Sequence, residues 1–171
     1  LGRCPTSWPS SKSRLMDKVE IAQQFLPLWP RPLPEMQIRP LGDGHINDTY
    51  LVESERFRFV LQRLNTQVFK DPETVQRNLI TVWNHLTASR YSLKFPVLCP
   101  TAEGHLFTDE AGSVWRAFVH LENTFTPTGK LSPQIAFEAA NAVGLLLKNI
   151  SDLPAERLAE TIPGFHDTER R

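Results

Sequence analysis

The sequence predicts an α+β fold: about five antiparallel strands with one inserted helix, followed by a connector and a second long helix. Three patterns support this prediction. Short apolar stretches, several of them alternating with period two and bounded by turn residues, recur within 38–64 and 96–121. Residues 72–88 carry apolar side chains at helical spacing instead, and so do residues 133–149. We expect the first of these helices to be inserted between the third and the fourth strand.

Residues 1–15 are polar and aperiodic, and they lack the apolar centre of a secretory signal. Because the chain starts with Leu, we interpret 1–15 as a disordered leader or tag and Met16 as the native start. Asp17 can cap a short helix over 18–26. Pro27 would end this helix, and the alternating prolines that follow predict a stiff, extended connector.

Three consecutive strands are predicted next, over Ile38–Leu41, Thr49–Val52 and Phe57–Leu64. The third strand alternates with period two, so its residues divide between two faces. These faces are occupied by Phe57, Phe59 and Leu61 on one side and by Arg58, Val60 and Gln62 on the other. The connections are short enough for the three strands to be antiparallel neighbours.

The connection between the first two strands is the most informative turn of the chain. Gly42 and Gly44 can adopt positive φ and leave no side chain between backbone N–H groups and a ligand. Asn47 also tolerates the left-handed conformation. Such a turn can direct several N–H groups into one concavity, which suits phosphate oxygens. Taken alone, the spacing Gly-x-Gly-x-x-Asn also fits an ordinary hairpin turn.

A clear helix start lies at Asp71, which is followed by Pro72 and an acidic residue. The helix is predicted over 72–88, and its apolar stripe consists of Val75, Leu79, Val82, Trp83 and Leu86. We expect this helix to pack across the sheet. His85 borders the stripe, and we interpret it as a solvated or core-edge histidine.

The remaining elements follow in order. Pro96–Pro100 and His105–Thr108 predict short strands, and Val114–Leu121 alternates and predicts the last strand of the sheet. After a polar connector, Ser132 can cap an Ala-rich helix over 133–149. This helix has apolar residues on more than one face, which predicts an exposed apolar surface through which the chain could self-associate.

Composition limits the classes of function. The formal net charge is zero, which argues against nucleic acids or membrane surfaces as the main partners. No apolar stretch reaches the roughly 20 residues of a membrane-spanning helix. Cys4 and Cys99 lack metal-ligand spacing. We favour two reduced thiols in a cytoplasmic protein, with a disulfide between them as the alternative.

Several stretches of the chain together resemble one family, namely Gly42–Val52, Val60–Asn65 with Phe69, Val114–Arg116 and Phe165–Thr168. They resemble the amino-terminal lobe of the N-acetylhexosamine kinases, within the aminoglycoside phosphotransferase and choline kinase superfamily. The resemblance covers roughly 38–171. It implies a protein-kinase-like small, nucleotide-binding lobe over 16–121. Residues 122–171 would then be the hinge connector and the first helix of a truncated large lobe.

The resemblance also implies a function, the transfer of phosphate from ATP to a hydroxyl of a small molecule such as an amino sugar. The implied nucleotide-binding residues are Gly42, Gly44, His45, Asn47 and Thr49 in and after the turn, Gln62 and Arg63 in the third strand, and His120, Leu121 and Glu122 at the hinge. Gln62 and Arg63 stand where many kinases place Lys. Arg63 either holds phosphate oxygens through its guanidinium fork or is a solvated strand residue.

Part of the kinase machinery has no counterpart in the sequence. The pattern His-x-Asp, followed five residues later by Asn, does not occur, and His166 and Asp167 resemble it only superficially. No later Asp is available for Mg²⁺, and neither Glu73 nor Arg77 matches the usual glutamate of the inserted helix. We therefore expect an ATP-binding fragment that is inactive alone, with Mg²⁺ required only in the full-length enzyme. The alternatives are a non-catalytic binding or scaffold module and a pseudokinase.

Overall fold

The computed structural model describes residues 11–26, 32–42, 44–89, 91–125, 127, 129–165 and 167–169. These residues form two compact units. One unit comprises the described parts of Leu1–Leu64 together with Leu98–Val119, and the other comprises those of Asn65–Val97 together with His120–Arg171. The chain therefore leaves the first unit after Leu64 and returns to it at Leu98.

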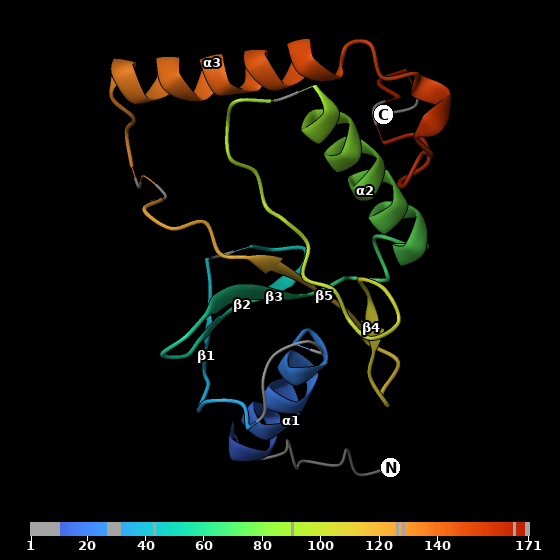
Figure 1. Ribbon diagram of the computed structural model, residues 1–171. Helices are drawn as coiled ribbons and strands as arrows, with labels where there is room; N and C mark the ends of the chain where they lie inside the picture. The colour runs from blue at the N-terminus through green and yellow to red at the C-terminus, as the bar shows by residue number, and fades with distance from the viewer. Residues whose placement is uncertain are drawn as a thin grey trace, which may run out of the picture. The chain divides into compact units, whose positions relative to one another are not determined.

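The first unit contains a five-stranded antiparallel sheet with the strand order β1-β2-β3-β5-β4 (Figure 1). Its strands are β1 (Gln37–Pro40), β2 (Asp48–Glu53), β3 (Arg58–Arg63), β4 (Phe107–Thr108) and β5 (Val114–Val119). Helix α2 (Pro72–Ala88) is inserted in the sequence between β3 and β4. The predicted α+β class, the five strands and the position of the inserted helix are therefore confirmed.

One of the predicted short strands does not form. Within Pro96–Pro100, only Leu98 makes an isolated bridge, with Phe118 of β5. The two prolines at the ends of this segment lack a backbone N–H, so they cannot extend a ladder of hydrogen bonds. The prediction of a strand over Pro96–Pro100 was wrong for this reason.

Helix α1 (Ser11–Gln24) starts earlier than predicted. Asp17 lies inside this helix, so the prediction that Asp17 caps a helix over 18–26 was wrong. Residues 11–16 show no apolar periodicity, but Lys, Arg, Leu and Met are all good helix formers. At the other end, Phe25 and Leu26 follow the helix rather than belonging to it. The part of the predicted leader over 1–10 lies outside the described residues.

Helix α1 covers one face of the sheet (Figure 1). The core between them consists of Ile21, Ala22, Phe25, Leu26, Val52, Phe59, Leu61, Cys99, Trp115 and Ala117. The predicted alternation of β3 is confirmed, because Phe59 and Leu61 are both in this core. Cys99 is a free thiol, and burial raises its pKa to about 11. Cys4 lies outside the described residues.

The turn between β4 and β5 is built around Asp109. Its Oδ1 accepts hydrogen bonds from the backbone N–H groups of Ala111 (3.0 Å) and Ser113 (2.8 Å). Its Oδ2 accepts one from the indole N–H of Trp115 at 2.8 Å. Burial acts to raise the pKa of Asp109, but these hydrogen bonds outweigh it and the pKa is lowered. The carboxylate thus ties the turn to a core tryptophan.

The second unit contains α2, α3 (Pro133–Ile150) and the short 3-10 helix η1 (Ala155–Arg157). Both long helices start where predicted. Asp71 accepts a hydrogen bond from the Thr74 N–H (3.0 Å), and Ser132 accepts one from the Ile135 N–H (3.3 Å). Each is followed by a proline at the first helical position. These caps explain why the helix starts could be predicted from the sequence.

Polar contacts connect α2 to the residues at and after the end of α3. His85 Nε2 lies 3.0 Å from the Asn149 carbonyl oxygen and 2.9 Å from Asp152 Oδ1. The Asn78 amide donates to the Ala159 carbonyl oxygen (2.7 Å) and accepts from its N–H (3.0 Å). His85 is therefore a partly buried structural contact, consistent with its interpretation as a core-edge residue.

Burial along the helices of the second unit differs from the apolar pattern. Of the residues in the predicted apolar stripe of α2, only Leu86 is buried. Two polar residues outside this stripe, Thr74 and Gln76, are also buried. In α3 no residue is buried, and Phe137, Val143 and Leu147 are more than half exposed. The predicted exposed apolar surface on α3 is thus present.

Within the described part of the chain, no helix has both the length and the apolar composition to cross a membrane.

The cap of α2 leads to a pH prediction. The Thr74 hydroxyl, and then the Thr74 N–H, donate to Asp71 and lower its pKa below the ordinary 3.8, although burial opposes this. A lowered folded-state pKa stabilises the fold above the pKa of the unfolded state, and the contribution is lost as pH falls through the folded-state value. We expect urea midpoints to fall below about pH 4 and Asp71→Asn to weaken this dependence. An identical pH profile for Asp71→Asn would contradict the prediction, and Glu110→Gln at an exposed site is the control.

Candidate functional site

The described part of the turn between β1 and β2 leaves open space at Gly42. It is closed at its base by a hydrogen bond from the Leu41 N–H to the Thr49 carbonyl oxygen at 2.9 Å. Gly42 has φ +73°, and a Cβ added there would meet no heavy atom of the described residues within 4 Å. This space allows a ligand atom to approach the backbone at Gly42. His45, also predicted to bind the nucleotide, is exposed in the same turn.

The backbone of the turn differs from the prediction at two positions. Gly44 and Asn47, which could have adopted positive φ, do not do so, and Gly42 alone of the three is left-handed. One left-handed residue already reverses the chain direction at this turn. A concavity for phosphate oxygens at this turn stays a prediction. Asp43 lies outside the described residues.

Successive residues of a strand point to opposite faces, so the sheet offers a second surface away from α1. Phe59 and Leu61 of β3 face the core, so Val60 and Gln62 face the opposite side of the sheet. On this second face, register places Thr49 of β2 opposite Gln62 of β3, and Gln62 opposite Arg116 of β5. Three neighbouring strands therefore each contribute one polar side chain to a single row.

These three side chains form a hydrogen-bonded chain. The Gln62 amide donates from Nε2 to the Thr49 hydroxyl at 3.1 Å. Its Oε1 accepts two hydrogen bonds from Arg116, from Nε at 3.0 Å and from Nη2 at 2.8 Å. The Arg116 guanidinium also lies over the ring of Phe118, 5.0 Å from the ring centroid. We call Thr49, Gln62 and Arg116 the polar row.

Arg116 is partly buried, and burial lowers its pKa to about 10. The guanidinium is therefore charged at neutral pH. Two of its five N–H groups donate to Gln62, and no carboxylate of the described residues pairs with it. The remaining N–H groups and the positive charge can bind an anion.

Arg63 has a different environment. It forms an ion pair with Asp48, directly opposite in the register of β2 and β3, and both side chains are about half exposed. Arg63 lies two residues after Leu61 and so on the face that carries α1. The structure thus brings Gln62 together with Thr49 but places Arg63 on the other side of the sheet.

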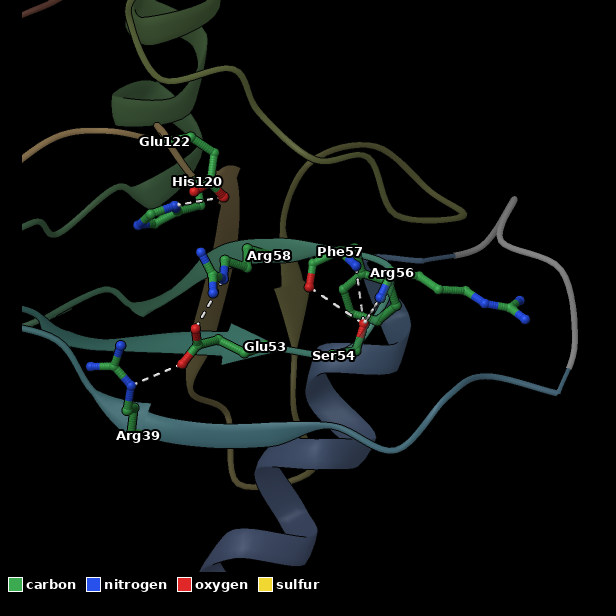
Figure 2. A network of polar contacts seen from close by, with 8 residues as sticks. All are labelled: Arg39, Glu53, Ser54, Arg56, Phe57, Arg58, His120 and Glu122. Atoms are coloured by element: carbon green, nitrogen blue, oxygen red, sulfur yellow. Dashed lines mark hydrogen bonds and ion pairs between the residues drawn. The ribbon is translucent and has the colours of Figure 1, made fainter.

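The second face carries further arginines next to the polar row. Glu53 of β2 pairs with Arg39 of β1 (2.9 Å) and with Arg58 of β3 (3.0 Å), as Figure 2 shows. Strand alternation places all three on the same face as Gln62. One carboxylate thus serves two guanidinium groups, and Arg116 adds a third positive charge. This face of the sheet is positively charged, which favours anions.

The predicted hinge residues belong to the second unit and follow β5 directly in the sequence. His120 Nδ1 lies 3.2 Å from Glu122 Oε1, and the Leu121 carbonyl oxygen accepts a hydrogen bond from the Thr124 hydroxyl at 2.9 Å. The chain turns at Asn123, which has φ 60°. A role of these residues in binding adenine stays a prediction.

Among the described residues, no three His, Cys, Asp or Glu side chains lie close enough together to hold a metal. The expectation that Mg²⁺ is required only in the full-length enzyme stays a prediction. His166, which the sequence placed in a partial catalytic-loop pattern, is outside the described part.

Two residues of interest were not identified from the sequence. Arg116 received no role of its own, although an arginine within the otherwise apolar pattern of β5 was a usable signal. Gln76 in α2 is 3% exposed, and its Nε2 and Oε1 have no hydrogen-bond partner among the described residues. No periodicity or motif marked Gln76 as unusual.

Comparison with known proteins identifies the fold. No protein-family model matches the chain. The solved structure of a microcompartment-associated aminopropanol kinase is similar, with a TM-score of 0.62 and 20% sequence identity. The match covers 89% of this chain and 48% of that kinase, so the chain spans about half of its length. The five-stranded sheet with its inserted helix thus has the α+β fold of a kinase small lobe.

Proposed function

We propose that this chain is the nucleotide-binding part of a small-molecule kinase, whose complete form transfers a phosphoryl group from ATP to a hydroxyl group. The observation that carries the proposal is the open turn at Gly42, which leads into a positively charged sheet face at Thr49. Backbone N–H groups and a guanidinium are the donors that bind phosphate oxygens in proteins. The kinase-like fold supports the same assignment.

In the proposed reaction, a bond forms between the acceptor oxygen and the γ-phosphorus of ATP. The bond from that phosphorus to the oxygen bridging the β-phosphate breaks, ADP leaves, and the hydroxyl proton passes to a base. Most of the catalysis in such transfers comes from positioning and from stabilising the phosphate charge. We assign the binding of the phosphates to this chain and the base to the complete enzyme.

The proposed acceptor is a small hydroxyl compound that also carries nitrogen. The sequence resemblance suggests an amino sugar, and the structurally similar kinase is named for aminopropanol, an amino alcohol. Both compounds combine a hydroxyl acceptor with a nitrogen substituent. We propose this shared chemistry as the substrate class.

Titration of the ¹⁵N-labelled chain with ATP tests the proposed function. We expect amide resonances of Gly42, Gly44 and Asn47 to shift, because phosphate oxygens would approach this turn. Gly112, in the turn between β4 and β5, is the internal control and should not shift. Absence of any shift at millimolar ATP would contradict the proposal.

A second candidate is a non-catalytic binding module. The exposed apolar side chains of α3, which include Phe137, Val143 and Leu147, favour this candidate because such surfaces often bind other proteins. A further alternative is a pseudokinase, a protein that has the kinase fold but does not transfer phosphate. In the full-length protein, nucleotide binding that does not change on addition of magnesium would favour the pseudokinase.

A further inference from the structure

Arg116 differs from the other arginines in the strands of the sheet. Arg39 and Arg58 pair with Glu53, and Arg63 pairs with Asp48. Arg116 is partly buried and, among the residues that the structure describes, donates only to the neutral amide oxygen of Gln62. Removing a charge from water is unfavourable unless an opposite charge offsets it. The uncompensated charge indicates that an anion completes this site.

The surroundings of Arg116 also hold its guanidinium in one orientation. Gln62 Oε1 accepts from Nε and Nη2, and the guanidinium carbon lies over the Phe118 ring. Gln62 is in turn held by its hydrogen bond to Thr49, which directly follows the first residue of β2. This chain of contacts connects the cation to the strand that leaves the open turn. A preorganised guanidinium loses less entropy when it binds phosphate oxygens.

We propose that Arg116, oriented by Gln62, is the cation that binds the polyphosphate of the nucleotide. This inference rests on the proposed function and deepens it. The β3 position that holds lysine in many kinases would here carry Gln62, a neutral residue, and β5 would supply the charge. Arg63 cannot take this role on the same face, because it points to the α1 side and is neutralised by Asp48.

Three variants of the chain test this inference. Arg116→Gln removes the charge, and Gln62→Glu leaves Arg116 in place but neutralises it with an adjacent carboxylate. Arg63→Gln is the matched control, since it removes a positive charge from the neighbouring position on the opposite face. The probes are ATP, adenosine and inorganic tripolyphosphate, and binding is measured by calorimetry or by competition with a fluorescent nucleotide.

We expect Arg116→Gln and Gln62→Glu each to weaken ATP and tripolyphosphate binding by about 10- to 100-fold. Adenosine binding should change by less than about 2-fold, because adenosine has no phosphate charge. Arg63→Gln should bind all three probes like the parent. Circular dichroism checks folding, and if Arg116→Gln does not fold, Gln62→Glu decides the question because it adds an ion pair instead of removing one.

The outcomes separate the inference from the proposed function. If the parent binds ATP and neither variant weakens that binding, the inference is wrong while the proposed function stands. If Arg63→Gln weakens ATP and tripolyphosphate binding as much as Arg116→Gln does, the assignment to Arg116 is also wrong. If the parent binds neither ATP nor adenosine, both the proposed function and the inference fail.

Discussion

Trp115→Ala is expected to lower the free energy of unfolding of the chain by about 3–5 kcal/mol, the range for removing a large buried aromatic side chain. Trp115 is 4% exposed, and its ring lies 6.3 Å from that of Tyr50, centroid to centroid. Its indole N–H is bonded to Asp109. The substitution would therefore open a cavity beneath α1 and also remove the indole donor from Asp109 Oδ2, while the two backbone donors to Oδ1 remain.

Two further variants separate these contributions. Trp115→Phe keeps most of the ring but loses the indole N–H, so we expect a smaller loss than for Trp115→Ala. Val119→Ala, at a half-exposed position on the same strand, should change stability by no more than about 0.5 kcal/mol. Urea unfolding followed by far-UV circular dichroism measures all three. If Trp115→Ala were no less stable than Val119→Ala, the described core of the first unit would be incorrect.

Leu61→Ala is expected to cost about 2–5 kcal/mol. Leu61 is fully buried at the centre of β3, between the two strands that pair with it. A small domain has only about 5–15 kcal/mol of total stability, so the variant should unfold at a much lower urea concentration. The same denaturation experiment measures the effect.

Leu61→Met is the control for this prediction, because it preserves most of the volume and should cost less than about 1.5 kcal/mol. An effect of Leu61→Ala no larger than that of Leu61→Met would show that the site collapses around the smaller side chain. In that case the close packing between α1 and β3 would need revision.

The local features of the fold could be predicted from the sequence because single residues encode them. Asp71 with Pro72, and Ser132 with Pro133, mark helix starts through hydrogen bonds made within a few residues. The period-two alternation of β3 likewise identifies its buried face. The start of α1 could not be found in this way, because residues 11–16 have no apolar periodicity and the serines of this stretch single out no one position as the cap.

The candidate site could be predicted only in part, because it depends on register between strands that are far apart in the sequence. Gln62 and Arg63 are neighbours in the chain, yet they lie on opposite faces and have different partners. Arg116 is 54 positions away from Gln62 and contacts it directly. No pattern within one strand reveals which residue of another strand will lie opposite.

The pairing of Gln62 with Arg116 has a consequence for how kinase relatives are recognised. Two adjacent strands share one surface, so Arg116 of β5 lies one strand spacing, about 5 Å, from the facing position on β3. A search that requires lysine at a fixed place on the third strand would discard a sequence that carries its positive charge on the fifth. A criterion that accepts a positive charge at either of the two facing positions would retain it.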